Sequence, residues 1–466
     1  MKYKLILLLS AALCFSCTKI IRQTVYEYLP QEVDPADIPD PGTSDDDGDD
    51  GLAGRLIYSV QSFGVLPTNT PGVNKIKLQN AIDWASEQGA AIYIDPVKGG
   101  YPVGSGIILK QNVSLIGVHG PTGRGTAVTL DDGKRSPTGS LFVISDNSHP
   151  FITVESATQI RGIQFYYPEQ AFDDPSKVIE YPPTIQVSQT RGVQGVTLSC
   201  LTFYGATFAM DFQANAQYNA SGGFTGGTPC EQILFEHCYG YPLSGQFIAV
   251  SSCFDIPRIL HCHVNPAVMR EFKGDYNKAM LDYVVSRKNY TYRIEHTDNA
   301  QIMDIFTYGN YGGIFLGPYT YGQLTNFNFD CVHTGVFKDG NSAFNRVWEV
   351  AQGSIIATVP SGSEGIHPFL VQGNGHLSIT NVDCFGTSVP QLTSVREATD
   401  YIRVQGSSYV TVTGVNCRMR NYSSSSPITI ANANAEVKFV NAVDKNSEVF
   451  DYWYKNGKTV TDFGNN

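Results

Sequence analysis

The sequence contains few charged residues and no segment in which lysines and arginines cluster. Asp, Glu, Lys and Arg make up 16% of the 466 residues, whereas hydrophobic residues make up 42%. This balance is ordinary for a folded, soluble chain, and the absence of a basic run argues against nucleic acid as a partner. The net charge of −11 comes largely from one acidic segment, 32–50, so the rest of the chain is only mildly acidic.

The hydrophobic run at the N-terminus, Leu5–Phe15, is too short to span a bilayer. It follows Lys2 and Lys4, which is typical of a secretion signal. Ser16 before Cys17 resembles the cleavage box of bacterial lipoproteins, and this resemblance implies that Cys17 becomes the acylated first residue. We therefore expect an exported protein that is lipid-anchored to the bacterial outer membrane, on its periplasmic or cell-surface side. An ordinary signal cleaved nearby is the alternative.

The segment after Cys17 is rich in Pro and Asp and predicts a tether. Its acidic run, 45–50, lacks the spacing and the final Glu of a calcium loop, so we interpret it as a solvated spacer. The chain then divides into a signal, 1–17, a tether, 18–53, and one main domain, 54–466.

One short pattern recurs along the main domain. Each copy has apolar residues at alternate positions, a corner of Gly, Ser or Asn, and a second alternation that often ends on Cys. A unit too short to bury its own apolar face must stack on copies of itself, as in a solenoid. Period-two alternation favours strands over helices, so the pattern predicts an all-β parallel β-helix. The clearest copies are 150–165, 182–200, 368–384, 401–417 and 427–443.

Eight cysteines remain after Cys14 and Cys17. Five of them lie two residues beyond an apolar residue, and we expect these to form one internal ladder with Phe165, where cysteine acts as a small hydrophobe. Cys230 and Cys253 lie outside the pattern and are the better disulfide candidates, although the sequence leaves their pairing open. The five expected ladder members are Cys200, Cys262, Cys331, Cys384 and Cys417.

Two stretches break the repeat, 214–229 and 265–289, and we expect both to leave the coil as long insertions. Such insertions commonly build the binding face of a solenoid, but decoration of the side wall is the alternative. Upstream, 74–88 predicts an amphipathic helix that ends at Gly89. We expect this helix to cover the open N-terminal end of the solenoid.

The N-terminal passage, 59–120, contains four motifs in order: VQSFGV at 60–65, LQNAI at 78–82, AIYIDP at 91–96 and NVSLIG at 112–117. With these motifs it resembles the opening of the pectate lyase superfamily domain found in rhamnogalacturonase-like and epimerase-like proteins. It implies a right-handed parallel β-helix, with 54–120 as cap and first coils, and action on or binding to polysaccharide. It does not imply one reaction, because the superfamily includes hydrolases, lyases, epimerases and tailspikes.

Hydrolysis of a glycosidic bond needs two carboxylic groups. The richest segment is 293–333, where stacked coils could bring Asp298 or Asp304 near Asp330 on one outer face. We therefore predict that Asp298, Asp304, Asp330 and His333 are catalytic and that Tyr308 and Tyr311 stack on sugar rings. Ordinary outward polar residues of a solenoid are the alternative interpretation.

A lyase would need a basic group, or calcium, to hold a uronate carboxylate. Lys273, Arg287, Lys288 and Arg293 could serve as the basic groups, and we count Lys273, Arg287 and Arg293 as substrate-binding candidates. Solvated loop charges are the alternative.

Two familiar kinds of site are missing from the sequence. The polygalacturonase motifs are not present in their order, so none of that group's catalytic residues is carried over to this chain. A metal site at 261–263 is disfavoured, because Cys262 should point inward and His261 and His263 outward. The sequence thus favours a glycoside hydrolase acting on pectin-like or other complex glycans without a cofactor. A glycan-binding or structural β-helix, or a calcium-assisted lyase, is the alternative, and the oligomeric state is open.

Overall fold

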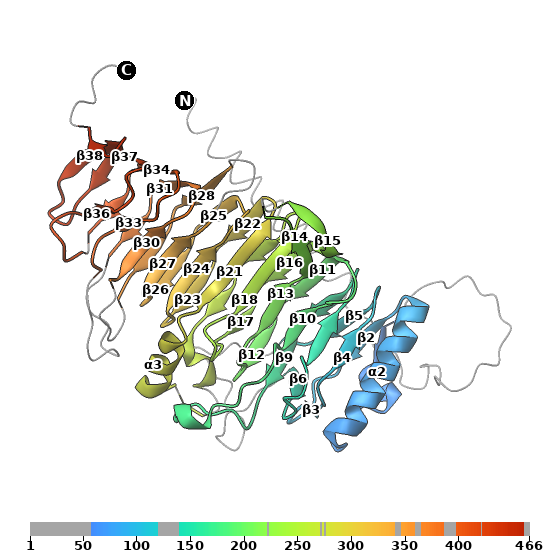
Figure 1. The fold of residues 1–466 in the computed structure, drawn as a ribbon. Coiled ribbons are helices and arrows are strands. Elements are labelled where there is room, and N and C mark those ends of the chain that lie inside the picture. Colours follow the sequence, from blue (N-terminus) through green and yellow to red (C-terminus); the bar gives the residue numbers. More distant parts are fainter. Residues whose placement is uncertain are drawn as a thin grey trace, which may run out of the picture. The chain divides into compact units, whose positions relative to one another are not determined.

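The computed structural model describes residues 57–119, 139–220, 223–270, 273–274, 276–340, 346–358, 365–385, 398–420 and 422–460. Within this part the chain is a right-handed parallel β-helix, which confirms the predicted fold class (Figure 1). The predicted signal, Cys17 and the tether 18–53 lie outside the described residues. No helix in the described part is both long enough and apolar enough to cross a membrane.

Each coil contributes one short strand to each of three faces, which we call sheets I, II and III. Sheet I consists of β4 (Ile107–Leu109), β7 (Ile152–Val154), β10 (Ile185–Val187), β13 (Met210–Gln213), β18 (Ile248–Cys253), β21 (Tyr290–Thr297), β24 (Gly312–Leu316), β27 (Thr334–Lys338), β30 (His367–Val371), β33 (Ile402–Val404) and β36 (Ile428–Ile430).

Sheet II begins beside the N-terminal cap and ends in antiparallel strands at the C-terminus. It consists of β1 (Ile57–Ser59), β2 (Ala91–Ile94), β5 (Ser114–Gly117), β8 (Gln159–Arg161), β11 (Val193–Ser199), β16 (Cys230–Glu236), β19 (Arg258–Leu260), β22 (Ala300–Met303), β25 (Gly322–Thr325), β28 (Val347–Ala351), β31 (His376–Thr380), β34 (Val410–Val415), β37 (Ala435–Val443), β38 (Val449–Lys455) and β39 (Lys458–Thr459).

Sheet III has the shortest strands. It consists of β3 (Tyr101–Pro102), β6 (Ser140–Val143), β9 (Ile163–Tyr166), β12 (Thr202–Tyr204), β17 (Tyr239–Gly240), β20 (His263–Val264), β23 (Phe306–Tyr308), β26 (Asn328–Asp330), β29 (Ser354–Ile356), β32 (Asp383–Cys384) and β35 (Arg418–Met419).

A single residue in the left-handed conformation turns the chain from sheet II into sheet III. Positive φ is costly for most residues but tolerated by Asn and Asp, which explains why the corner is mostly polar. We call this column the left-handed corner; its members include Cys200, His237, His261, Asp304, Asn326, Gln352, Asn381, Asn416 and Asn441.

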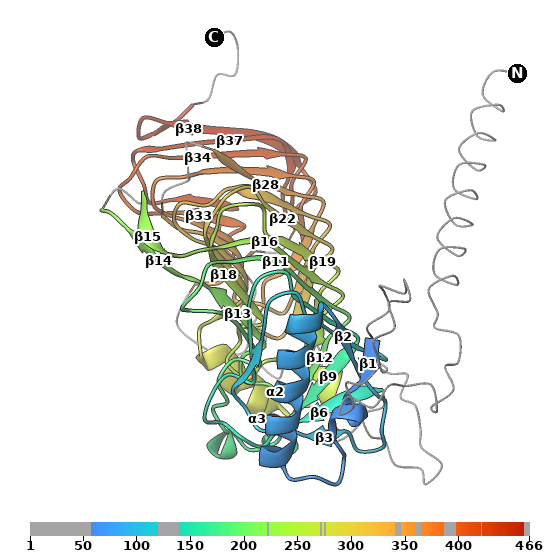
Figure 2. The same ribbon diagram turned by 90° about the vertical axis from the view of Figure 1, so that its right-hand side faces the viewer.

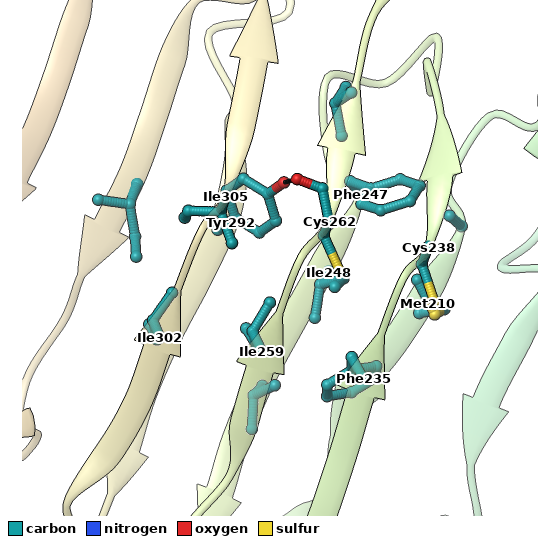
Figure 3. Close-up of a cluster of buried hydrophobic side chains, with 14 of the residues drawn as sticks. Met210, Phe235, Cys238, Phe247, Ile248, Ile259, Cys262, Tyr292, Ile302 and Ile305 are labelled. Carbon is teal, nitrogen blue, oxygen red and sulfur yellow. Dashed lines mark hydrogen bonds between the residues drawn. The ribbon is translucent and has the colours of Figure 1, made fainter. Parts of the chain in front are cut away.

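The core is a set of ladders in which equivalent inward residues stack between coils. Figure 3 shows Phe235, Ile259 and Ile302 in one ladder and Met210, Ile248 and Tyr292 in another. Tyr292 buries its ring and donates its hydroxyl to the backbone oxygens of Cys262 and Phe306 at 3.3 and 3.1 Å, so the polar atom keeps partners.

The predicted single cysteine ladder is wrong. Cys262 and Cys417 do occupy the same inward column, directly after the left-handed corner, together with Cys238. Cys200 itself forms that corner and is only half-buried. The reason is that the corner residue resets the inward–outward alternation, so a spacing of two does not mark one column.

Two further cysteines of the expected ladder lie elsewhere. Cys384 stacks one strand later, in the sheet III column that includes Phe165, and Cys331 is a buried turn residue after β26. Cys230 and Cys253 are free, buried thiols placed opposite each other on neighbouring strands.

The predicted capping helix is confirmed as α2 (Pro71–Gln88), which lies over the N-terminal end of the β-helix (Figures 1 and 2). Thr70 caps its N-terminus, and Gly89 ends it with φ 65°. Leu78 and Ile82 are fully buried, as the amphipathic pattern predicts. A 3-10 turn, η2 (Val60–Phe63), precedes the helix.

Both predicted insertions leave the coil, and they do so at opposite ends of sheet I strands. The first forms a hairpin of β14 (Asn215–Tyr218) and β15 (Phe224–Thr228) after β13. The second forms η4 (Pro266–Met269) and α3 (Lys278–Ser286) before β21, and α3 contacts η3 (Pro175–Lys177). Figure 2 shows sheet I between the hairpin and α3.

Candidate functional site on sheet I

The structure does not bring Asp298 and Asp304 together. Asp298 lies in the turn between β21 and β22, where it accepts a hydrogen bond from Tyr321. Asp304 lies beyond the other end of β22, in the left-handed corner, where Oδ2 is 2.8 Å from Nδ1 of His261. The length of β22 therefore separates the two carboxylates, and they face different corners of the coil.

Asp330 and His333 lie at a third place, around the turn from sheet III to sheet I. Asp330 sits beside Tyr308 on the neighbouring strand, and His333 stacks on Tyr311 with ring centroids 4.6 Å apart. Asp304 pairs in register with Asn326, four residues before Asp330. The expectation of one cluster of aspartates is therefore wrong.

The basic residues of the second insertion contact protein groups. Lys273 donates from Nζ to the backbone oxygens of Pro168 and Gln170, at 2.6 and 3.0 Å. Arg287 forms an ion pair with Glu180, at 3.1 Å. Both side chains therefore attach the insertion to the long turn between β9 and β10.

Arg293, in contrast, points outward from sheet I. Its Nη2 lies 2.6 Å from Oε1 of Glu295, and its guanidinium covers the Phe315 ring at 4.3 Å from the centroid. The two charged side chains are 32% and 17% exposed, so the ion pair lies partly in water. Because residues two apart on a strand share a face, this pair marks the outer face of sheet I.

A row of polar side chains runs along this face from coil to coil. Its members follow from the strand register, and two of them are hydrogen-bonded: Gln405 donates from Nε2 to Oε1 of Gln372 at 2.9 Å. Amides and carboxylates both hydrogen-bond hydroxyl groups. We call this feature the polar row; its positions are Gln213, Ser251, Glu295, Gly317, Asp339, Gln372 and Gln405.

Gly317 leaves a gap in the polar row between Glu295 and Asp339. A side chain at Gly317 would place its Cβ 2.6 Å from Cγ of Glu295, so glycine is required where Glu295 bends over the next strand. Asp339 accepts a hydrogen bond from the backbone N–H of Gly340 at 2.7 Å. Two carboxylates thus stand two strands apart, about 9.6 Å between Cα atoms at the usual strand spacing.

A third carboxyl group, Asp211, lies on the same face two strands before Arg293. Its Oδ1 accepts hydrogen bonds from the backbone and the side chain of Gln213, at 3.1 and 3.0 Å. Burial raises the pKa of Asp211 in spite of these bonds. A carboxyl group with a raised pKa is suited to donating a proton.

Aromatic rings line both ends of the sheet I strands. Beside the hairpin, Tyr218 stacks on His296 at 4.1 Å, and His296 stacks on Tyr319 at 5.6 Å. Burial lowers the pKa of His296 although Glu295 opposes the shift. At the other end, the rings of Tyr290 and Tyr311 are 5.9 Å apart. Sheet I therefore presents polar groups between two aromatic margins.

Sequence reasoning named Arg293 but missed Glu295, Asp339 and Asp211. Arg293 and Glu295 are two residues apart within a strand pattern, and this spacing could have predicted that they share a face. No signal could have found Asp339 or Asp211, because their neighbours depend on the register of separate coils. Among the described residues no group of three or more His, Cys, Asp or Glu could hold a metal ion.

No protein-family model and no curated protein sequence matches the chain. Several solved structures, however, align with it. Gene product 12 of bacteriophage phi29 aligns with a TM-score of 0.51 at 14% identity, over 83% of this chain and 52% of that protein. Gene product 12 thus shares the overall fold of this chain.

Two further structural matches have lower TM-scores. The gp42 tailspike of Acinetobacter phage vb_AbaP_AS12 aligns with a TM-score of 0.43 at 9% identity, over 89% of this chain and 66% of that protein. DFA-IIIase from Arthrobacter chlorophenolicus A6 aligns with a TM-score of 0.45 at 11% identity, over 84% and 95%. This chain thus spans about half and about two thirds of the two phage proteins. At 14% identity, the match to gene product 12 establishes the fold alone.

Proposed function

We propose that the protein binds a polysaccharide along the outer face of sheet I and hydrolyses it. The main support for this proposal is that Glu295 and Asp339 both lie in the polar row, with only Gly317 between them. Glycoside hydrolysis uses two carboxyl groups, about 6.5–9.5 Å apart where a water attacks the sugar directly. Since Glu295 extends over Gly317, its carboxylate lies nearer Asp339 than the Cα spacing suggests.

The groups around the pair support binding of a hydroxyl-rich polymer. The polar row offers donors and acceptors on successive coils, and the aromatic margins add rings of the kind that contact sugars. We assign the role of base towards water to Glu295, which is already an ion-paired carboxylate, and the role of acid towards the leaving oxygen to Asp339, because it is the second carboxyl group of the pair. Asp211, three strands before Gly317, extends the acidic part of the face.

The test is to incubate the full-length protein with a panel of plant and host polysaccharides and to measure new reducing ends. We expect Glu295→Gln and Asp339→Asn each to lower turnover by at least a hundredfold, because each removes one of two required groups. Asp304→Asn is the matched control on another corner and should keep full turnover. Thermal unfolding of all three variants checks folding.

Other outcomes point to other functions. Full turnover in both variants at Glu295 and Asp339 would sink the assignment of this pair. Binding without products would identify a glycan-binding β-helix instead. Products with a new double bond, seen by their ultraviolet absorbance and lost with a calcium chelator, would identify a lyase. Hydrolysis itself should need no cofactor.

We also propose that the chain is exported and lipid-anchored at Cys17, as its N-terminal pattern indicates. Such an anchor would hold the sheet I face near extracellular or periplasmic polysaccharide. In a bacterial host, the wild-type protein should incorporate labelled palmitate, and it should be recovered in the outer-membrane fraction. Cys17→Ser should abolish both, and persistent labelling of that variant would refute the anchor.

A further inference from the structure

A concave pocket lies on the outside of the last coils, where sheet II turns into sheet III. It has a volume of 550 Å³ and takes the same two positions from each of three successive coils. One position is the left-handed corner, which supplies three asparagines. The other is the first outward residue of sheet III. The lining side chains used here are Asn381, Asn416, Asn441, Asp383, Arg418 and Val443.

The pocket contains one cation that the described protein leaves available. Asp383 and Arg418 are neighbours in register, but Asp383 is occupied by Arg420, which donates from Nε at 2.9 Å and also from Nη2. The Arg418 side chain is exposed, and its guanidinium has no hydrogen bond or ion pair within the described ranges. The positive charge of Arg418 is therefore free to meet a ligand.

The three asparagines share one backbone conformation, and two of their side-chain amides are hydrogen-bonded. Their φ angles are 53° or 54°, which sets the same backbone conformation in each coil. Asn441 donates from Nδ2 to Oδ1 of Asn416 at 2.6 Å. Each amide carries both a donor and an acceptor, and groups that are ordered before binding lose less entropy when a ligand arrives.

We propose that this pocket binds a carboxylate-bearing sugar. Arg418 would receive the carboxylate through its planar fork, the asparagine amides would hold the hydroxyl groups, and Val443 would contact the ring. The volume lies within the usual range for small-ligand sites. The pocket lies outside sheet I and does not depend on the hydrolysis proposed there, so it would act as a separate anchoring site for acidic glycans.

The experiment is calorimetric titration of the full-length protein with galacturonate, with neutral galactose and with inorganic sulfate. We expect galacturonate to bind and galactose and sulfate to bind at least tenfold more weakly, because only the first offers a carboxylate and hydroxyl groups together. Arg418→Gln should lower galacturonate affinity at least tenfold, and Arg418→Lys should restore part of it. Arg191→Gln, at an exposed ion pair with Glu155, is the control and should change nothing.

Two further variants make the result specific. Arg420→Gln should also weaken binding, because it frees Asp383 to compete for Arg418. Glu295→Gln should keep full galacturonate affinity, which separates this pocket from the sheet I face. Equal binding of galactose, equal binding of sulfate, or unchanged affinity in Arg418→Gln would each overturn the proposal.

Discussion

Lys338 is a buried cation directly beneath the polar row. It occupies an inward position of β27, between Leu316 and Val371 of the neighbouring strands. Its Nζ donates to the backbone oxygens of Gly317, Asp339 and Gly340, at 3.2, 3.0 and 3.1 Å. The side chain thus supports the backbone on which the gap at Gly317 and the Asp339 carboxylate depend.

Burial lowers the pKa of Lys338 to about 7, with Asp339 opposing the shift; His376 is a further titratable group that Lys338 influences. Lysine in an unfolded chain has a pKa near 10.5. Between these values the unfolded state binds more protons than the folded state, so the contribution of Lys338 to the free energy of unfolding rises with pH. From pH 7 to pH 9 the rise is about 2 kcal/mol.

Lys338→Met should remove this dependence. When the pH rises from 7 to 9, we expect the free energy of unfolding of the wild-type protein to rise by about 2 kcal/mol more than that of the variant. Urea unfolding at each pH measures this difference. Lys110→Met, which removes an exposed ion pair with Asp83, is the control. Its free energy of unfolding should change with pH as that of the wild type does. If the free energy of unfolding of Lys338→Met changed with pH as that of the wild type does, Lys338 would titrate near its ordinary pKa.

At the scale of elements, the sequence predicts strands and helices well but not how strands align between coils. Helix α2 and its Gly89 end follow from local signals, namely an apolar face and a terminator. Register is different, as Gly414 shows. Aligning the repeats on Cys384 and Cys417 places Ile379 beside Val412, whereas Ile379 pairs with Gly414. The Phe439 ring of the next coil fills the inward space at Gly414.

The same limit explains the candidate site. Arg293 and Glu295 belong to one strand, so their shared face was readable from the alternation of residues. Glu295 and Asp339 become neighbours only through two register steps across Gly317. Stacking of coils was expected to bring Asp298 or Asp304 near Asp330, but the three aspartates lie at different places around the coil. Sequence proximity is a poor guide to contact where each coil contains three changes of direction.

At the scale of the whole β-helix, repetition produces rows of similar side chains. Equivalent positions of successive coils stack, so one favourable position becomes a line of similar groups: amides and carboxylates in the polar row, asparagines in the left-handed corner. Both proposed sites arise in this way, on different faces of the same solenoid. The same repetition creates open ends, where unpaired backbone and apolar core would meet water.

Helix α2 should therefore be required to keep the β-helix from associating through its N-terminal end. Ile82 is fully buried beneath the helix, whereas Ile76 on the same helix is 61% exposed. Ile82→Asp would bury an unpaired charge and lift the helix from the end of the solenoid. We expect size-exclusion chromatography with light scattering to show self-association of Ile82→Asp, while Ile76→Asp elutes like the wild type. Identical elution of both variants would mean that another element protects this end.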